Sequence, residues 1–338
     1  MHRAFFICYN RHMNQWKKII IAAVIVLAVL AGLGVAYAML FAAPGTNTEQ
    51  QQFTIPLEAT STPVVAAQLQ QAGLVKNAWA FQVAFGLHKG NIQAGGYLLS
   101  PSMNAWQAAR VLSQPPALRW AVIPEGLRKE EIAAILAKAL DWSSAQEQEW
   151  IATDTAQNPD YIEGVYFPDT YLIPITDTPA QVAQRLIAKF EEKFAPYAKE
   201  AIAQNIRWVT VLRLASIVQR EAAGKSDMPL VAGILWNRLL KNMKLQVDST
   251  VQYARGNTGK GWWAPISVAD EKIDSPYNTY LYAGLPPHPI DNPGLDAINA
   301  VLNPAKTDCM YYLHDTAGQI HCAVTYQEHL KNIQTYLQ

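Results

Sequence analysis

The chain has 338 residues, half of them hydrophobic, so it can bury a sizeable core and is more naturally read as two folded units than as one. Disorder is therefore not the expected state. Lysine plus arginine and aspartate plus glutamate number 27 each, so the overall charge gives no reason to expect nucleic acid or another polyanion as a partner. A neutral or mixed-charge ligand fits this balance better.

An uncharged apolar run occupies residues 19–41. At about 1.5 Å per residue, a helix of this length crosses a bilayer core of roughly 30 Å, which predicts a transmembrane helix. The basic residues before it are Arg3, Arg11, Lys17 and Lys18. By the positive-inside rule, residues 1–18 are then a cytoplasmic tail and the rest lies outside. The alternative is a signal peptide cleaved near residues 36–38, but the apolar run is longer than a signal-peptide core, which favours an uncleaved anchor.

The rest of the chain is expected to form three parts. Residues 42–52 are polar and lack apolar periodicity, which predicts a short flexible linker. Residues 53–118 mix strand and helix patterns, which predicts a small α+β subdomain, and residues 119–338 are expected to form a larger mixed α/β domain. Strand patterns lie at 53–55 and 97–99, and helical patterns at 62–72, 102–112, 179–194, 205–223 and 229–240.

Two cysteines beyond the membrane, Cys309 and Cys322, flank a predicted hairpin with its turn at 315–318. A four-residue loop would place Cys309 opposite Val324 and Cys322 opposite Tyr311. The two sulfur atoms would then be diagonal neighbours. A disulfide would need a shifted register, so we do not expect one.

A zinc site near this hairpin is not expected either. The available ligands are Cys309, His314, His321 and Cys322, and none of their spacings matches a C-x2-C or H-x3-H pair. No phosphate-binding loop, nucleophile elbow or dinucleotide fingerprint occurs in the sequence. We therefore predict no metal site.

Glu221 is the strongest candidate for chemistry. Three apolar residues precede it at helical spacing and share its face: Leu214, Ile217 and Val218. Desolvation on that face would raise the pKa of the carboxyl group, as a general acid for glycoside cleavage requires. The alternative is an ion pair with Arg220 or Arg238 at the edge of a core, and periodicity alone favours that alternative.

Several longer motifs follow the pattern of one family. They are IPEGL at 123–127, EGVYFPDTY at 163–171, LASIVQREAAGKSDMPLVAGILWNRLLKNMKLQVDSTVQYA at 214–254, YNTYLYAGLPPHPIDNPGLDAINAVLNPA at 277–305, and YYLHD at 311–315 followed by His321 and Glu328-His329. In their order and number they resemble the YceG/MltG family of endolytic murein transglycosylases.

The resemblance implies a single-pass inner-membrane protein with a LysM-like subdomain at 53–118 and a catalytic domain at 119–338. Such a domain cuts β-1,4 bonds between N-acetylmuramic acid and N-acetylglucosamine in nascent glycan strands. The family's catalytic glutamate falls on Glu221, which would act first as acid and then as base to give 1,6-anhydro ends. No cofactor is implied. The implied partners are peptidoglycan strands and peptidoglycan synthases (penicillin-binding proteins), although the sequence shows no docking motif for the latter.

The chain departs from the family pattern at three positions. Many members carry Glu at the position of Gln219, which points roughly 200° away from Glu221 on a helix and so cannot share its role. Ser249 stands where the LQxDPT phrase has proline, and His288 stands where GLPPGPI has glycine. The last two departures concern the shape of the loops.

Four further residues are predicted to bind substrate, each with a structural alternative. Gln246 and Asn278 could donate amide hydrogen bonds to N-acetyl groups or brace a proline-rich loop. Asp248 could be a second acid, but a capping carboxylate at a helix start is the better interpretation. Tyr280 could stack on a sugar ring or fill the core. Glu163 precedes a glycine and is predicted to be structural.

Two other functions stay open. A muramidase of the lysozyme type would need a second carboxylate or a positioned water, and Asp248 is the nearby candidate. A non-catalytic cell-wall binding protein would use only its LysM-like unit. Glu221 speaks against that function, because a pure binder gains little from a carboxylate on an apolar face.

Overall fold

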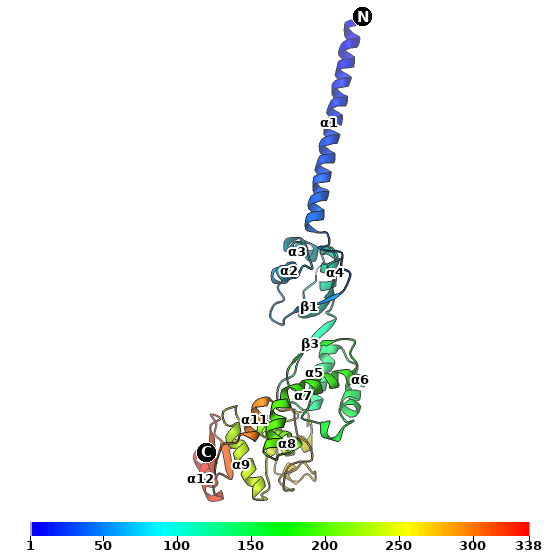
Figure 1. The fold of residues 1–338 in the computed structure, drawn as a ribbon. Coiled ribbons are helices and arrows are strands. Elements are labelled where there is room, and N and C mark those ends of the chain that lie inside the picture. The colour runs from blue at the N-terminus through cyan, green and yellow to red at the C-terminus, as the bar shows by residue number, and fades with distance from the viewer. Residues whose placement is uncertain (1, 89, 338) are drawn as a thin grey trace. The chain divides into compact units, whose positions relative to one another are not determined.

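A computed structural model describes residues 2–88 and 90–337, and the chain divides into two compact units, Met1–Arg119 and Trp120–Gln338 (Figure 1). The division falls one residue beyond the boundary drawn from the sequence. Each unit contains helices and strands, so the α+β class is confirmed. Four strands form one sheet in the order β1-β2-β3-β4, and β3 (Leu118–Val122) carries the chain from the first unit into the second.

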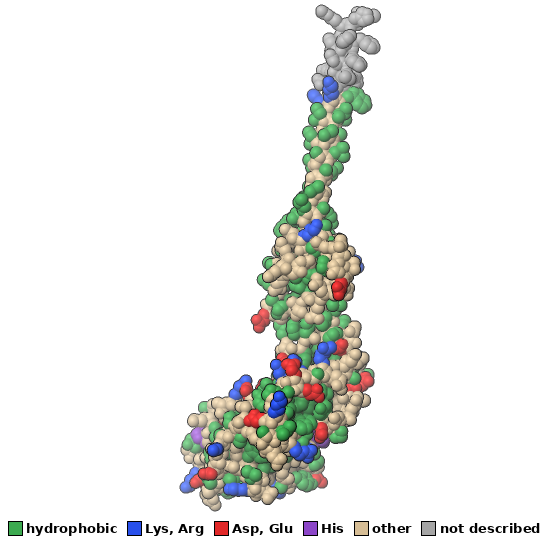
Figure 2. Space-filling model, viewed as in Figure 1, with side chains coloured by type: hydrophobic (Ala, Val, Ile, Leu, Met, Phe, Trp, Pro, Cys, Tyr) green, Lys and Arg blue, Asp and Glu red, His purple; other side chains and the backbone are tan. Residues whose placement is uncertain are grey.

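The first unit begins with the long helix α1 (His2–Leu40). Its stretch Trp16–Leu40 is long and apolar enough to cross a membrane, and no residue in the most apolar window of that stretch is buried. Hydrophobic side chains coat this part of the helix (Figure 2). A helix that is apolar on all sides needs an apolar environment. Its length and composition fit a membrane anchor or a signal sequence.

The rest of the first unit packs helices on a strand pair. The strands are β1 (Gln51–Ile55) and β2 (Gly95–Leu99), which run antiparallel with Gln51 opposite Leu99. The helices are α2 (Thr62–Gln71), α3 (Ala78–Gly86) and α4 (Ala105–Leu112). The helical pattern predicted from 102 starts only at Ala105, because the Asn104 side chain caps the helix there. Helix α3 is absent from the sequence prediction.

The segment 42–50, which belongs to the predicted linker 42–52, makes backbone hydrogen bonds with the turn after β2. The Gly45 amide donates to the Pro101 carbonyl at 2.9 Å, and the Ser102 amide donates to the Asn47 carbonyl at 3.0 Å. These backbone bonds join the segment to the turn that follows β2. Polarity alone does not predict disorder where the backbone finds a partner.

The second unit is mainly helical. Its helices are α5 (Lys129–Leu140), α6 (Ser144–Glu149), a π-helical turn (Trp150–Asp154), α7 (Pro179–Ala203), α8 (Trp208–Glu221), α9 (Met228–Leu240), α10 (Asp248–Arg255), α11 (Leu295–Leu302) and α12 (Tyr326–Tyr336), with single 3-10 turns at Pro159–Tyr161 and Asp270–Lys272. Its strands are β4 (Thr170–Pro174) and the hairpin of β5 (Tyr311–His314) and β6 (Ile320–Ala323).

Helix α8 lies at the centre of this unit and packs against α7, α9 and α11. Leu214, Ile217 and Val218 are fully buried, as their periodicity predicts. Helix α7 is longer than predicted, because it continues past Pro196 to Ala203. Proline usually ends or kinks a helix, but packing of the apolar face continues beyond it.

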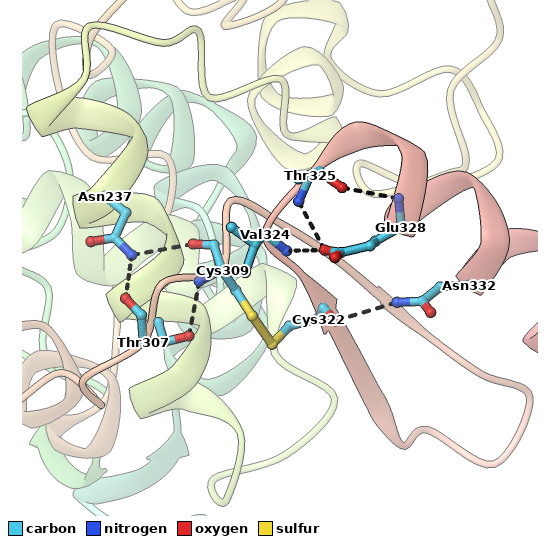
Figure 3. The surroundings of a disulfide bond; sticks show 8 residues. All are labelled: Asn237, Thr307, Cys309, Cys322, Val324, Thr325, Glu328 and Asn332. Carbon is cyan, nitrogen blue, oxygen red and sulfur yellow. Dashed lines mark hydrogen bonds between the residues drawn. A yellow bond between two sulfur atoms is a disulfide. The ribbon is translucent and has the colours of Figure 1, made fainter.

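The hairpin contains a disulfide between Cys309 and Cys322, so the prediction that the two cysteines are not bridged is wrong (Figure 3). Its loop spans 315–319, with Gly318 at φ 79°, and this extra residue places Tyr312 opposite Cys322. The left-handed glycine after a tight turn is typical of a hairpin with a bulge, which shifts the register that a four-residue loop would give. The longer loop does not bring Cys309 opposite Cys322, but Cys309 lies two residues before β5, outside the paired ladder. It forms a disulfide with Cys322 across a Cα–Cα distance of 5.9 Å.

Replacing both bridged residues, as Cys309→Ser with Cys322→Ser, is expected to lower the free energy of unfolding by about 3 kcal/mol, because the bridge closes a short loop in the unfolded chain. Urea titration of the full chain measures this difference. Cys8→Ser is the matched control and should leave the midpoint unchanged. An equal midpoint for the double variant and the parent chain would contradict a bridge.

Glu163 is fully buried and joins the start of α5 to the loop that contains Asn292. Its Oε1 accepts hydrogen bonds from the Lys129 amide at 3.1 Å and from the Asn292 side chain at 2.6 Å. Burial, with a smaller effect of the negative charge on Glu130, raises the pKa of Glu163 from 4.5 to about 8. This placement agrees with the predicted structural role.

The raised pKa makes stability depend on pH. The unfolded chain loses this proton near pH 4.5 and the folded chain only near 8, so stability falls as pH rises through that window. Glu163→Gln should flatten this fall, because the amide does not ionise. Melting temperatures of both chains between pH 4.5 and 8 provide the measurement, and parallel curves would show that Glu163 does not titrate there.

Candidate active site

Glu221 is the last residue of α8, at the end of the buried apolar stripe. The helix stops there because Ala222 takes an extended conformation. The next turn is held by Asp227, whose carboxylate accepts the amides of Ala223 and Gly224 at 3.0 Å each. The carboxyl group of Glu221 is thus fixed where the core of the unit meets its surface.

Three hydrogen bonds reach the carboxyl group of Glu221. Ser249 donates its hydroxyl to Oε1 at 2.7 Å and its amide at 3.3 Å. Tyr312 donates its hydroxyl to Oε2 at 2.9 Å. The three residues come from α8, the start of α10 and β5, so distant parts of the chain build one site.

The ion-pair alternative for Glu221 is not what the structure shows. Arg238 donates to the carbonyl oxygens of Met310 and Leu245, both at 2.6 Å. Arg220 instead stacks on the Trp263 ring at 4.1 Å. Within residues 2–88 and 90–337, no salt bridge joins either arginine to Glu221.

Burial raises the pKa of Glu221, although the hydrogen bonds from Ser249 and Tyr312 oppose the rise by stabilising the charged form. The negative charge of Asp248 adds to the rise. Burial also raises the pKa of Tyr312 well above its usual range, and the charge of Glu221 adds to this effect. Tyr312 therefore stays protonated and remains a donor.

The carboxyl group faces a cavity of about 360 Å³. Most of the residues that line it are polar, and they include two acids, one arginine, one glutamine, four tyrosines and one histidine. The lining residues are Glu221, Arg238, Leu245, Gln246, Val247, Asp248, Tyr280, Tyr311, Tyr312, Tyr326 and His329. A groove of about 510 Å³ between α7 and the start of α8 is larger but mainly apolar. Because binding sites need convergent polar groups, the cavity at Glu221 is the better candidate.

Three of the predicted substrate-binding residues line this cavity. Gln246 is exposed, with a left-handed φ of 51°, and its backbone amide donates to the Thr279 carbonyl at 3.2 Å. Tyr280 donates its hydroxyl to Asp248 at 2.7 Å. Asp248 is the first residue of α10, whose cap residue is Val247, so the capping role expected for Asp248 is wrong.

Asn278 lies outside the cavity. It is completely buried, and its amide nitrogen donates to the carbonyl oxygens of Glu271 and Ile273 at 2.9 and 2.8 Å. Its side-chain oxygen accepts the Tyr280 amide at 2.9 Å. These bonds favour the loop-bracing alternative, and one of them holds the backbone of Tyr280.

Sequence reasoning did not find Ser249 and Tyr312 as partners of Glu221. Ser249 carried one signal, because it replaces the proline of the family phrase and so supplies a hydroxyl and an amide. Tyr312 lies in the YYLHD motif, but this motif does not indicate a contact with Glu221, which is 91 residues away. His314 is two residues further along β5 and pairs with Asp227 at 2.7 Å, which ties the hairpin to the turn after α8.

The sequence profile of the YceG-like family matches residues 53–335. The chain belongs to this family. Proteins named endolytic murein transglycosylase are 28% identical in two strains of Streptococcus pneumoniae, over 95% of this chain, and 30% identical in Bacillus subtilis, over 82% of each chain. The chain spans 65% of the length of the pneumococcal relatives.

A solved structure shares the fold of this YceG-like chain. The crystal structure of a yceG-like protein from Listeria monocytogenes superposes with a TM-score of 0.57 at 29% identity. The match covers 84% of this chain and 99% of that one. The family resemblance drawn from the sequence motifs is thereby confirmed.

Tyr312→Phe is expected to raise the pKa of Glu221 further, because it removes a donor that stabilises the carboxylate. Ser249→Ala should act in the same direction. Titration of the carboxyl carbon of Glu221 by NMR measures the shift. Tyr311→Phe is the matched control: Tyr311 lines the same cavity, but within the described residues it makes no hydrogen bond to Glu221. An unchanged titration in both test variants would contradict the bonding described above.

Proposed function

We propose that this chain is an endolytic murein transglycosylase with Glu221 as its catalytic acid and base. Its substrate would be the β-1,4 bond between N-acetylmuramic acid and N-acetylglucosamine in nascent glycan strands. Family membership and the names of three relatives support the reaction class. The observation that carries the choice of residue is a carboxyl group with a raised pKa at the wall of a polar cavity.

The proposed reaction begins with Glu221 in its protonated form. The carboxyl group donates its proton to the glycosidic oxygen as the bond to the muramyl C1 breaks. The C6 hydroxyl of the same sugar then forms a bond to C1, and Glu221 takes the hydroxyl proton. The products are a 1,6-anhydromuramyl end and a free hydroxyl on the leaving sugar. Because the second step restores the proton lost in the first, one carboxyl group suffices.

The partners of Glu221 suit both steps. Burial favours the protonated acid that starts the reaction, whereas Ser249 and Tyr312 stabilise the carboxylate that follows. Tyr312 stays protonated throughout, so it donates in both states without competing for the substrate proton. Gln246, Asp248 and Tyr280 line the same cavity and are proposed to contact the sugars.

A muramidase is the second candidate, because Asp248 provides another carboxylate in the cavity. In that reaction Asp248 would act as nucleophile or activate water, and the product would be a reducing end. Asp248 is engaged by the Tyr280 hydroxyl at 2.7 Å, which suits a group that positions Tyr280. A non-catalytic cell-wall binding protein is the weakest candidate, since it would have no use for the polar surroundings of Glu221.

The proposed location is the inner membrane, with α1 as a single-pass anchor, a cytoplasmic N-terminus and the LysM-like and catalytic parts outside. The apolar surface of α1 supports the anchor. Peptidoglycan synthases are proposed as partners on the family resemblance alone.

Glu221→Gln should lower the rate of glycan cleavage by about 10²-fold or more, because it removes the acid and base while keeping the size of the side chain. Mass spectrometry of peptidoglycan digests, with the full chain in detergent, should show 1,6-anhydro ends from the parent chain. Full activity of Glu221→Gln would refute the role of Glu221.

Asp248→Asn separates the two reactions within the same cavity. A transglycosylase should still give anhydro ends with this variant, at a lower rate because Asp248 is proposed to contact the sugars. Reducing ends from the parent chain, lost on Asp248→Asn, would establish the muramidase instead. Peptidoglycan binding by Glu221→Gln together with no cleavage by the parent chain would establish a binding protein.

A further inference from the structure

Helix α3 in the first unit is apolar on both faces. Its inner face buries Ala80, Phe81, Ala84 and Phe85 in the core of the unit. On the opposite face Trp79, Val83 and Leu87 follow one another at intervals of four residues, and they are 58, 37 and 71% exposed. We call these three residues the α3 stripe. Helices on the surface of a protein normally expose a polar face to water, whereas the α3 stripe exposes apolar side chains.

The α3 stripe starts beside the end of α1. The Trp79 ring contacts the Phe41 ring edge-on at a centroid distance of 6.2 Å, and Phe41 stacks on Tyr37 and on Trp106 at 5.3 and 5.5 Å. Lys76, just before α3, donates its ammonium group to the Ala38 carbonyl at 3.3 Å. Figure 1 shows α3 at the end of this unit from which α1 emerges, and hydrophobic side chains gather there in Figure 2.

The length of α1 sets the depth of this cluster. The uncharged part of α1, residues 19–40, has 22 residues and, at about 1.5 Å per residue, slightly exceeds a bilayer core of roughly 30 Å. Its last turn therefore reaches the interfacial layer when its apolar surface fills the core. Tryptophan and tyrosine favour this layer because they combine an apolar ring with a polar group. The cluster of Tyr37, Phe41, Trp79 and Trp106 has that composition.

We propose that the α3 stripe inserts into the interfacial layer of the membrane, at the point where α1 leaves it. The first unit would then be attached to the membrane along two helices, one that spans the bilayer and one that lies in its surface. This proposal rests on α1 as the anchor and is independent of the reaction at Glu221. A lipid surface fits better than a saccharide, because α3 has a single polar side chain, Gln82, and sugar sites need several polar groups.

Spin labels on the full chain in vesicles of phosphatidylethanolamine and phosphatidylglycerol test this. The parent for labelling is Cys8→Ser, because Cys309 and Cys322 are bridged. A nitroxide is attached at Val83→Cys, and Leu87→Cys is the second variant in case the first folds poorly. Leu57→Cys is the matched control, an exposed leucine of the same unit that follows β1. Val29→Cys reports the middle of α1.

The accessibility of each label to oxygen, relative to a water-soluble nickel complex, shows whether it lies in lipid. We expect the ratio of oxygen to nickel accessibility for labels at positions 83 and 87 to be several-fold higher than for the label at position 57. It should approach the ratio for the label at position 29 in the middle of α1. If the label at position 29 has the ratio of a group in lipid while the labels at 83 and 87 have the ratio of groups in water, the α3 stripe does not insert into the membrane, although α1 is still an anchor. If the label at position 29 has the ratio of a group in water, neither the anchor role of α1 nor the insertion of the α3 stripe holds. Labels at 83 and 87 that are shielded from both reagents, in detergent as in vesicles, would reveal a protein contact and also overturn the proposal.

Discussion

The site depends on one opposition at Glu221, between burial that disfavours its charge and hydrogen bonds that favour it. The apolar stripe of α8 supplies the burial, and Ser249 and Tyr312 supply the bonds. Burial without donors would leave a carboxyl group that cannot ionise, and donors without burial would leave an ordinary carboxylate. A group that must give and regain a proton needs both.

Ser249 shows how a departure from a family pattern can act on chemistry. From the sequence, its replacement of proline predicts a change in loop shape. The structure gives Ser249 two hydrogen bonds to Glu221, from its hydroxyl and from its amide, and proline offers neither donor. The charged state of Glu221 is therefore stabilised in this chain by groups that a proline at the same position would lack.

Periodicity predicted the elements whose pattern is local. The helices around Leu214 and Leu235 and the strands at 53–55 and 97–99 appear as expected, because each buries one face. Helix α3 is not predicted because it is apolar on both faces. The bonds from the segment 42–50 to residues 101–102 are not predicted because backbone hydrogen bonds do not depend on side chains. The disulfide is not predicted because Cys309 lies before β5, outside the ladder, where strand pairing does not fix its position.

The residues of the site also differ in whether they depend on local sequence patterns or on contacts between distant parts of the chain. The apolar surroundings of Glu221 could be predicted because its neighbours lie within two helical turns, although only the family motif pointed to it as a catalytic residue. Its partners Ser249 and Tyr312 are 28 and 91 residues away. Tyr312 reaches Glu221 only because β5 is fixed at both ends, by the bridge at Cys309 and by the pair of His314 with Asp227. Asp227 also holds the turn that ends α8. The hairpin and the helix end are thus fixed by a common residue, which keeps donor and acceptor in register.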